Sequence, residues 1–214
     1  MVSTAEEFNQ DVGPDDAIVV EEKGRGMTTA RGVGEHEQLI TGDELARMSD
    51  HDLCELIDGR IVPMSPTNPD HGRIEVNIAA ALRGVAGVQN LGIVMTGEVG
   101  IFTRWNPDRV RGADVVFITH AQYERRTKTR GFLDVAPELV VEILSPENRH
   151  VDMRQKVQEY LAIGVRLVLV VDPDDRAITA HGPDGTAARY VAGEVVPCDD
   201  VLPGFSLAVA AVLE

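Results

Sequence analysis

The sequence predicts an α/β or α+β fold. From residue 70, a helical segment is followed by two or three strands, a short helix and another strand. Residues 139–144, 151–163 and 165–171 then follow the order strand, helix, strand, which is typical of a parallel crossover. Short strands between glycine and proline turns over 176–207 indicate an added antiparallel edge.

The elements before residue 104 follow from local signals. Thr41 and Glu44 have the spacing of a capping box and predict a short helix over 41–49. Asp58-Gly59 is a two-residue hairpin signal between strands at 53–57 and 60–64. Apolar residues at helical spacing predict a core-facing helix over 70–86: Ile74, Ile78, Leu82 and Val85. Two β-like segments, 91–95 and 98–103, flank Thr96-Gly97.

The later elements include the most apolar stretches of the chain. Residues 113–118 predict a strand and 120–125 a short helix. The run 139–144 lies between two prolines and predicts a buried strand that contains one acid, Glu142. The helix over 151–163 ends at Gly164, and residues 165–171 form the next buried strand.

Length and charge limit the class of protein. The chain has 214 residues, 20 basic and 35 acidic, and a formal charge of −15. We expect one domain over 37–214, preceded by a flexible acidic extension over 1–36. No apolar run is long enough to cross a bilayer, and the first residues lack an export signal, so we expect a cytoplasmic protein without membrane contact. The negative charge argues against nonspecific coating of nucleic acid.

Two acids in core strands are the clearest functional signal. Asp114 opens the apolar run 115–118, and Glu142 interrupts the run 139–144. A buried carboxylate is costly unless it is paired, protonated or bound to a cation. If the two strands are neighbours, the acids can converge and supply oxygen ligands for Mg²⁺. Pairing of each acid with an arginine is the alternative explanation.

One lysine follows these acids on the next helix. Asp152, Lys156 and Tyr160 are spaced by four residues and are expected to share one helical face. A lysine on that face can orient an attacking water or stabilise charge on a phosphoryl oxygen. An ordinary ion pair between Asp152 and Lys156 is the simpler explanation for these two residues alone.

Several ordered motifs resemble one nuclease family. They are Glu55-Leu-Ile-Asp-Gly59, Ser65-Pro66 with His71, Arg111-Gly-Ala-Asp114, Pro137-Glu-Leu-Val-Val-Glu142-Ile-Leu-Ser-Pro146 and Asp152-Met-Arg-Gln-Lys156-Val-Gln-Glu-Tyr160. Together they resemble the Uma-type restriction endonucleases of the PD-(D/E)XK superfamily over roughly residues 40–210. The resemblance implies a restriction-endonuclease-like core, in which a central mixed sheet is flanked by helices. It also implies a homodimer and a divalent metal bound by Asp114 and Glu142.

The resemblance also suggests roles for supporting residues. The lysine usual two positions after the motif acid is Leu144 here, so the role is expected to pass to Lys156. Ala113 replaces the usual proline before the motif aspartate, which should change loop rigidity more than chemistry. Glu55 is expected to reach the metal or a bound water, and His71 to contact phosphate or transfer a proton. A solvated strand residue and a helix-capping residue are the respective alternatives.

These observations favour a Mg²⁺- or Mn²⁺-dependent endonuclease acting on DNA. Asp114 and Glu142 would hold the metal together with the backbone carbonyl of Ile143, and Lys156 would position water. Residues 104–130 hold seven basic and three acidic residues, so the DNA is expected along this segment. The proposed phosphate contacts are Arg104, Arg109 and Arg111. The main alternative is an inactive nuclease-fold module that binds protein or nucleic acid, and a weaker one is hydrolysis of another phosphoester.

Overall fold

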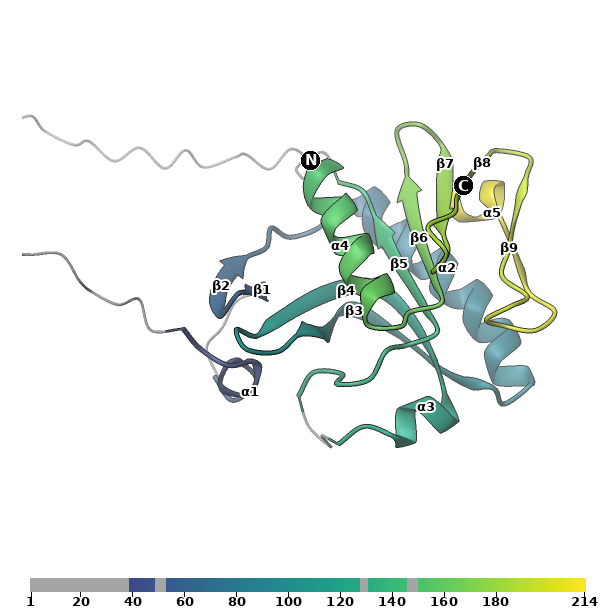
Figure 1. The fold of residues 1–214 in the computed structure, drawn as a ribbon. Coiled ribbons are helices and arrows are strands. Elements are labelled where there is room, and N and C mark those ends of the chain that lie inside the picture. Colours follow the sequence, from purple (N-terminus) through teal and green to yellow (C-terminus); the bar gives the residue numbers. More distant parts are fainter. Residues whose placement is uncertain (1–38, 49–52, 128–130, 146–149) are drawn as a thin grey trace, which may run out of the picture. The chain divides into compact units, whose positions relative to one another are not determined.

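The computed structural model describes residues 39–48, 53–127, 131–145 and 150–214 (Figure 1). The chain divides into two units, Met1–Glu37 and Gln38–Glu214. The predicted extension over 1–36 lies outside the described residues. No described helix is long and apolar enough to cross a membrane.

The described elements match most of the sequence predictions in order. The helices are α1 (Gly42–Leu45), α2 (Pro69–Val88), α3 (His120–Glu124), α4 (His150–Ala162) and α5 (Val209–Leu213). The strands are β1 (Cys54–Ile57), β2 (Arg60–Pro63), β3 (Gly92–Arg104), β4 (Arg109–Thr119), β5 (Leu139–Ile143), β6 (Leu167–Asp172), β7 (Ala177–His181), β8 (Ala187–Val191), β9 (Val195–Pro197) and β10 (Ser206–Ala208).

Eight of the described strands form one mixed sheet. Its order is β2-β1-β4-β5-β6-β7-β8, and β3 pairs with β4 beside this path. β5 and β6 are parallel and are joined through α4, whereas the other pairs of this sheet are antiparallel. A parallel pair needs a crossover connection, and α4 supplies it. The predicted strand, helix, strand unit is therefore confirmed.

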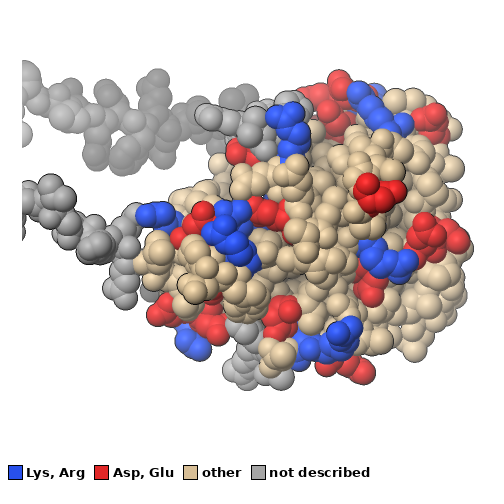
Figure 2. All heavy atoms as spheres, in the orientation of Figure 1, with Lys and Arg blue, Asp and Glu red and all other residues tan. Residues whose placement is uncertain are grey.

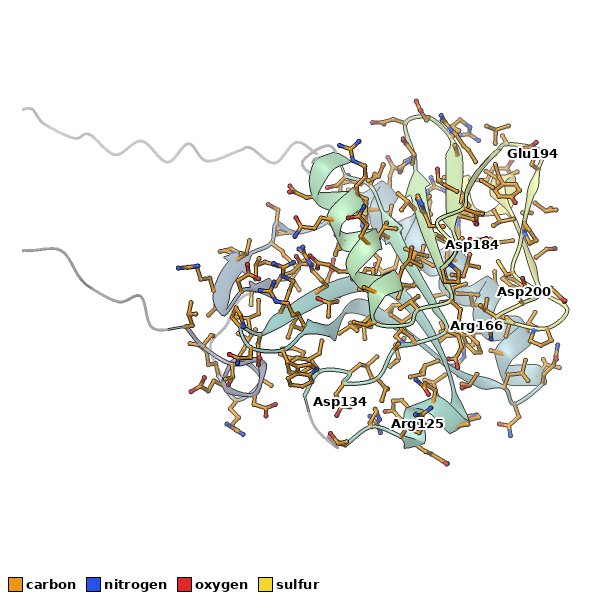
Figure 3. All side chains as sticks on the ribbon, in the orientation of Figure 1. Arg125, Asp134, Arg166, Asp184, Glu194 and Asp200 are labelled. Carbon is orange, nitrogen blue, oxygen red and sulfur yellow. The ribbon has the colours of Figure 1, made fainter. Side chains whose placement is uncertain are left out.

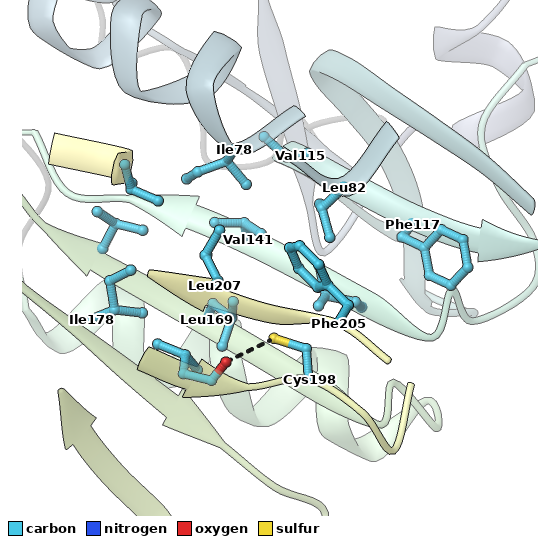
Figure 4. Packing of buried hydrophobic residues seen from close by; sticks show 14 of the residues in the cluster. Ile78, Leu82, Val115, Phe117, Val141, Leu169, Ile178, Cys198, Phe205 and Leu207 are labelled. Carbon is cyan, nitrogen blue, oxygen red and sulfur yellow. Dashed lines mark hydrogen bonds between the residues drawn. The ribbon is translucent and has the colours of Figure 1, made fainter. Parts of the chain in front are cut away.

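Helix α2 covers one face of the sheet. Its N-terminus is capped by the Asn68 side chain, which accepts a hydrogen bond from the His71 amide, and Pro69 occupies the first turn. The residues of its apolar stripe are buried: Ile74, Ile78, Leu82 and Ala86. They pack against alternate residues of the sheet, such as Val115 and Val141, with the C-terminal strands closing the cluster (Figure 4). This cluster is the main hydrophobic core.

Helix α4 covers the opposite face (Figure 1). Met153, Val157 and Tyr160 pack against residues such as Val140 and Val168. Because successive strand residues point to opposite faces, β5 directs Val141 toward α2 and Val140 toward α4. The fold is a mixed α/β sheet with helices on both faces, which confirms the α/β class and the arrangement that the family resemblance implies.

The structure differs from the sequence predictions in two strand boundaries and one added helix. Segments 91–95 and 98–103 are one strand, β3, which passes through a register shift between Thr96 and Val99. β4 starts at Arg109 rather than 113, because the long hairpin with β3 extends the ladder. The short helix α5 was not predicted; its buried residues join the main core.

Candidate active site

The acids Asp114 and Glu142 lie on neighbouring strands. The antiparallel register of β4 and β5 pairs Val115 with Val141, so the next position along sets Asp114 opposite Glu142. Both side chains are almost fully buried. The backbone amide of Ile143 donates a hydrogen bond to Asp114 Oδ2 at 2.5 Å. Among the described ion pairs of Asp114 and Glu142, none involves an arginine.

Helix α4 brings two side chains to Glu142. Lys156 Nζ donates to Oε2 at 2.7 Å, and the Tyr160 hydroxyl donates to Oε1 at 2.8 Å. Lys156 and Tyr160 are one helical turn apart and are both buried, so one face of α4 carries both groups. Burial raises the pKa of Glu142 to about 8, although the Lys156 charge opposes the rise. Burial also raises the pKa of Tyr160 well above its ordinary value, and the charge of Glu142 adds to this rise.

Lys156 is held between two acids. Its ammonium lies 2.7 Å from Glu142 Oε2 and 3.2 Å from Glu55 Oε1. Burial opposes its charge, but Glu142 and Glu55 outweigh that effect and raise the pKa of Lys156. Asp152 lies one turn before Lys156, at the start of α4, where its side chain is exposed. In the first turn of the helix, its charge is instead favoured by the helix dipole.

Glu55 is buried rather than solvated. Its Oε1 accepts a hydrogen bond from the Gly112 amide at 3.0 Å, and its Oε2 accepts one from Arg111 at 2.7 Å. The hydrogen bonds fix the carboxylate beside Lys156. Glu55 therefore belongs to the same cluster as Glu142 and Lys156.

The predicted phosphate contacts are mostly occupied by acids of the protein. Arg109 pairs with Asp58 and Glu159, and Arg111 bridges Glu55 and Glu159. Both arginines are buried, so neither presents its guanidinium at the surface. Arg104 is more open, with a side chain 43% exposed, and it pairs with Asp58. Of the three, Arg104 alone has a solvent-accessible side chain suited to a phosphate contact.

His71 lies at the N-terminal end of α2 and faces Asp114. Its Nε2 is 3.3 Å from Asp114 Oδ2, and its side chain is nearly fully buried. Burial opposes protonation, but the hydrogen bond and charge of Asp114 outweigh it and raise the pKa of His71. The His71 backbone amide, not the ring, takes part in the helix cap. Its imidazole is therefore part of the site rather than a surface capping group.

Leu144 occupies the position of the usual lysine and lies in an apolar setting. It packs against the cluster beneath α4 and lines a cavity of about 610 Å³ together with Met153 and Val157. That cavity lies between α4 and strands β6 to β8, and Asp114 and Glu142 are not among its lining residues. The cationic group near the acids therefore comes from α4, as Lys156.

Glu98 is a site residue that the sequence reasoning missed. It lies on β3 within the register shift, and its carboxyl is within hydrogen-bonding reach of Asp114. Its Oε2 is buried and has no hydrogen-bond partner among the described residues. Burial and the charge of Asp114 raise the pKa of Glu98 to about 7. An acid next to Gly97 in a β-like segment was the available signal, since such a pair can mark a bulge.

Asp114 and Glu142 are carboxylates, the ligand type that a hard divalent cation prefers. Among the residues that the structure describes, no three His, Cys, Asp or Glu side chains form a group that could hold a metal ion. Mg²⁺ needs fewer protein ligands, because it is usually bound by one or two carboxylates and keeps several waters. The unpartnered Oε2 of Glu98 next to Asp114 is the kind of oxygen that such a cation satisfies.

The fold and this buried acid and lysine cluster define a nuclease-like class of protein. The sequence model of the Uma2 family, described as "Putative restriction endonuclease", matches residues 43–210. The chain therefore belongs to the Uma2 family.

A solved structure has the same fold. It is described as a putative nuclease belonging to DUF820 from Anabaena variabilis ATCC 29413. It matches with a TM-score of 0.69 and 18% sequence identity, covering 81% of this chain and 97% of its own. No curated protein gave a match.

Proposed function

We propose that the protein is a divalent-metal-dependent endonuclease that hydrolyses phosphodiester bonds in DNA. The observation that carries the proposal is the antiparallel register that sets Asp114 opposite Glu142, with Lys156 of α4 buried against Glu142. Membership of the Uma2 family supports nuclease chemistry on this fold. Fold alone would not be sufficient, because one fold hosts many functions.

The residues have distinct proposed roles. Asp114 and Glu142 bind the cation, and the carbonyl of Ile143 completes the set. Mg²⁺ or Mn²⁺ held there would supply the Lewis acidity that polarises a phosphate and lowers the pKa of a bound water. Lys156 orients the attacking water through its buried charge, while Glu55 and Tyr160 keep Lys156 and Glu142 in place. His71, next to Asp114, contacts the phosphate or moves a proton.

The surface charge limits how DNA is bound. On the face in Figure 2, basic and acidic side chains are interspersed, and no continuous basic area covers the described residues visible there. The labelled charged residues in Figure 3 lie on loops and turns at the edge of the domain. With a net charge of −15, affinity for DNA must come from a few local contacts, such as Arg104, and from the bound cation. We further propose that the protein acts in the cytoplasm as a homodimer.

The alternative hypothesis, an inactive binding module, predicts a different arrangement of the acids and Lys156. It requires the two acids to be neutralised by arginines and Lys156 to point to solvent. In the described structure Lys156 is buried between Glu142 and Glu55, and neither Asp114 nor Glu142 pairs with an arginine. The geometry therefore favours the nuclease.

Cleavage of DNA by purified protein tests the proposal. Supercoiled plasmid and fragmented genomic DNA are incubated with Mg²⁺ or Mn²⁺ over a range of concentrations, and with a chelator. We expect nicking that needs the metal and falls by about 100-fold or more in Asp114→Asn and Glu142→Gln, since loss even of outer-shell partners costs about 10–100-fold. Both substitutions keep the side-chain shape and remove the charge.

Asp200→Asn is the matched control for this experiment. Asp200 is exposed on a loop, so the Asp200→Asn variant should cleave DNA at the wild-type rate. Nicking that persists in Asp114→Asn would place the activity elsewhere. Absence of cleavage of both DNA substrates by folded wild-type protein would instead favour the binding module.

A further inference from the structure

Three carboxylates lie in a row across three neighbouring strands. Beyond its register shift, β3 pairs Val99 with Ala113, so the next position sets Glu98 opposite Asp114. The register of β4 and β5 sets Glu142 on the other side of Asp114. Asp114 is thus flanked by one acid on each neighbouring strand. Like charges opposite one another destabilise a sheet unless another group compensates them.

The backbone at Glu98 is shaped to bring this carboxylate into the row. Gly97 and Glu98 have φ angles of 86° and 59°, a region that non-glycine residues rarely adopt. The Gly97 amide donates a hydrogen bond to Glu75 Oε1 of α2 at 3.0 Å, which anchors the distortion. Bulges of this kind redirect side chains and occur next to functional sites. The strained φ at Glu98 persists because the surrounding structure stabilises it.

The neighbouring strand leaves room for the Glu98 carboxylate. A Cβ built at Gly112 would lie 3.0 Å from Glu98 Oε2, so a larger residue there would press against this oxygen. Glu98 Oε2 is nevertheless buried without a hydrogen-bond partner in the described structure. Buried polar atoms without partners are rare, and each one calls for an explanation, of which a bound ion is one.

The oxygens of the row are not equally available. Both oxygens of Glu142 are engaged, one by Lys156 and the other by Tyr160. Asp114 Oδ2 receives the Ile143 amide and faces His71. Glu98 Oε2 is a buried carboxylate oxygen of the row for which the described residues supply no hydrogen-bond donor, so it can accept a cation.

We propose that Glu98 is a further ligand of the divalent cation, binding through Oε2 beside Asp114. This inference rests on the proposed function, because it concerns the same cation. A carboxylate oxygen is the ligand type that Mg²⁺ and Mn²⁺ prefer. The cation would satisfy the unpartnered oxygen and offset the repulsion between Glu98 and Asp114 at once.

Calorimetric titration of Mn²⁺ into the metal-free full-length protein tests this proposal without any DNA. We expect wild-type protein to bind Mn²⁺, and Glu98→Gln to lower the affinity by about 10-fold or more. Glu98→Asp keeps the charge but shortens the side chain, so its affinity should lie between the two. Glu138→Gln is the matched control, because Glu138 is a half-buried acid that bonds Thr119 away from the row. It should bind Mn²⁺ like wild type.

Thermal melting in chelator separates ligation from a structural role. Glu98→Gln removes an acid that lies opposite Asp114 on the neighbouring strand, so without metal it should melt at or above the wild-type temperature. Adding Mn²⁺ should then raise the melting temperature of wild type more than that of the variant.

Each other outcome contradicts the proposal in a distinct way. If wild type binds Mn²⁺ and Glu98→Gln binds it equally well, Glu98 is not a ligand, and the proposed function stands. If Glu98→Gln melts below wild type in chelator, the residue acts in folding. If wild type binds no Mn²⁺, both the ligand assignment and the metal-dependent function fail.

Discussion

Lys156 is the residue on which the site depends most. Its ammonium is buried in contact with Glu142 and Glu55 and balances part of their charge. A buried ion pair adds little net stability compared with apolar residues, but breaking it by removing one partner is costly. The lysine can thus support folding and chemistry through the same contacts.

We expect Lys156→Met to lower the free energy of unfolding by about 3–5 kcal/mol, because it leaves the buried carboxylates of Glu142 and Glu55 without the lysine ammonium that pairs with them. Urea unfolding in chelator measures this loss. Arg166→Met is the matched control, since Arg166 is exposed after α4, and it should change stability by less than about 0.5 kcal/mol.

The double variant Lys156→Met with Glu142→Gln checks the cause. Neutralising Glu142 should restore part of the stability, which is the coupling expected of residues in contact. If Lys156→Met unfolds at the same urea concentration as wild type, the ion pair between Lys156 and Glu142 does not contribute to stability as described.

The individual site residues were partly predictable from sequence. An acid in an apolar strand is conspicuous, which is why Asp114 and Glu142 stand out. Glu98 was missed because its position depends on a backbone distortion that periodicity does not encode. The arginines looked like phosphate contacts because sequence shows their charge but not Glu55 and Glu159, which are far from them in the chain.

At the scale of elements, an ion-pair network joins β4 to α4. Glu159 on α4 accepts hydrogen bonds from Arg111 and pairs with Arg109. Burial opposes ionisation of Glu159, but the hydrogen bond and charge of Arg111, with the charge of Arg109, outweigh it and lower its pKa. The network holds the helix that carries Lys156 against the strand that carries Asp114.

The lowered pKa of Glu159 gives a pH-dependent contribution to stability. Because the folded-state pKa lies below the ordinary value of 4.5, the contribution is present above that pH and is lost as acid protonates the folded carboxylate. We expect Glu159→Gln to unfold more easily than wild type at pH 7, by about 1–3 kcal/mol. The difference should shrink as the pH falls below 4.5.

Urea unfolding between pH 3 and pH 7 measures this difference. Glu124→Gln, an exposed change on α3, serves as the control and should stay within about 0.5 kcal/mol of wild type throughout. A stability gap for Glu159→Gln that is constant over the whole pH range would contradict a role for its charge.

The order of elements was predictable because helix and strand periods differ and turn residues mark their ends. Asp58 and Gly59 both adopt positive φ angles, as the two-residue hairpin signal requires. The length of β4 was not predictable, since charged residues such as Arg109 and Arg111 do not resemble a buried strand. Their burial depends on acids contributed by other elements.

For the whole molecule, two helices on opposite faces of one sheet position the site. Helix α2 brings His71 to Asp114, and α4 brings Lys156 and Tyr160 to Glu142. Glu142 on β5 and Lys156 on α4 belong to the same crossover from β5 to β6, so they lie close together in the chain. The overall fold was accessible from sequence because this crossover and the antiparallel tail have clear local signals.

Anomalous diffraction from crystals soaked in Mn²⁺ tests the central claim, that the acid row holds a divalent cation, most directly. We predict a peak about 2.0–2.6 Å from a carboxylate oxygen of Asp114, the range of metal–oxygen distances at such sites. The peak should disappear in Asp114→Asn crystals. Mn²⁺ bound only elsewhere on the protein, or absent from the row at a saturating concentration, would contradict the account.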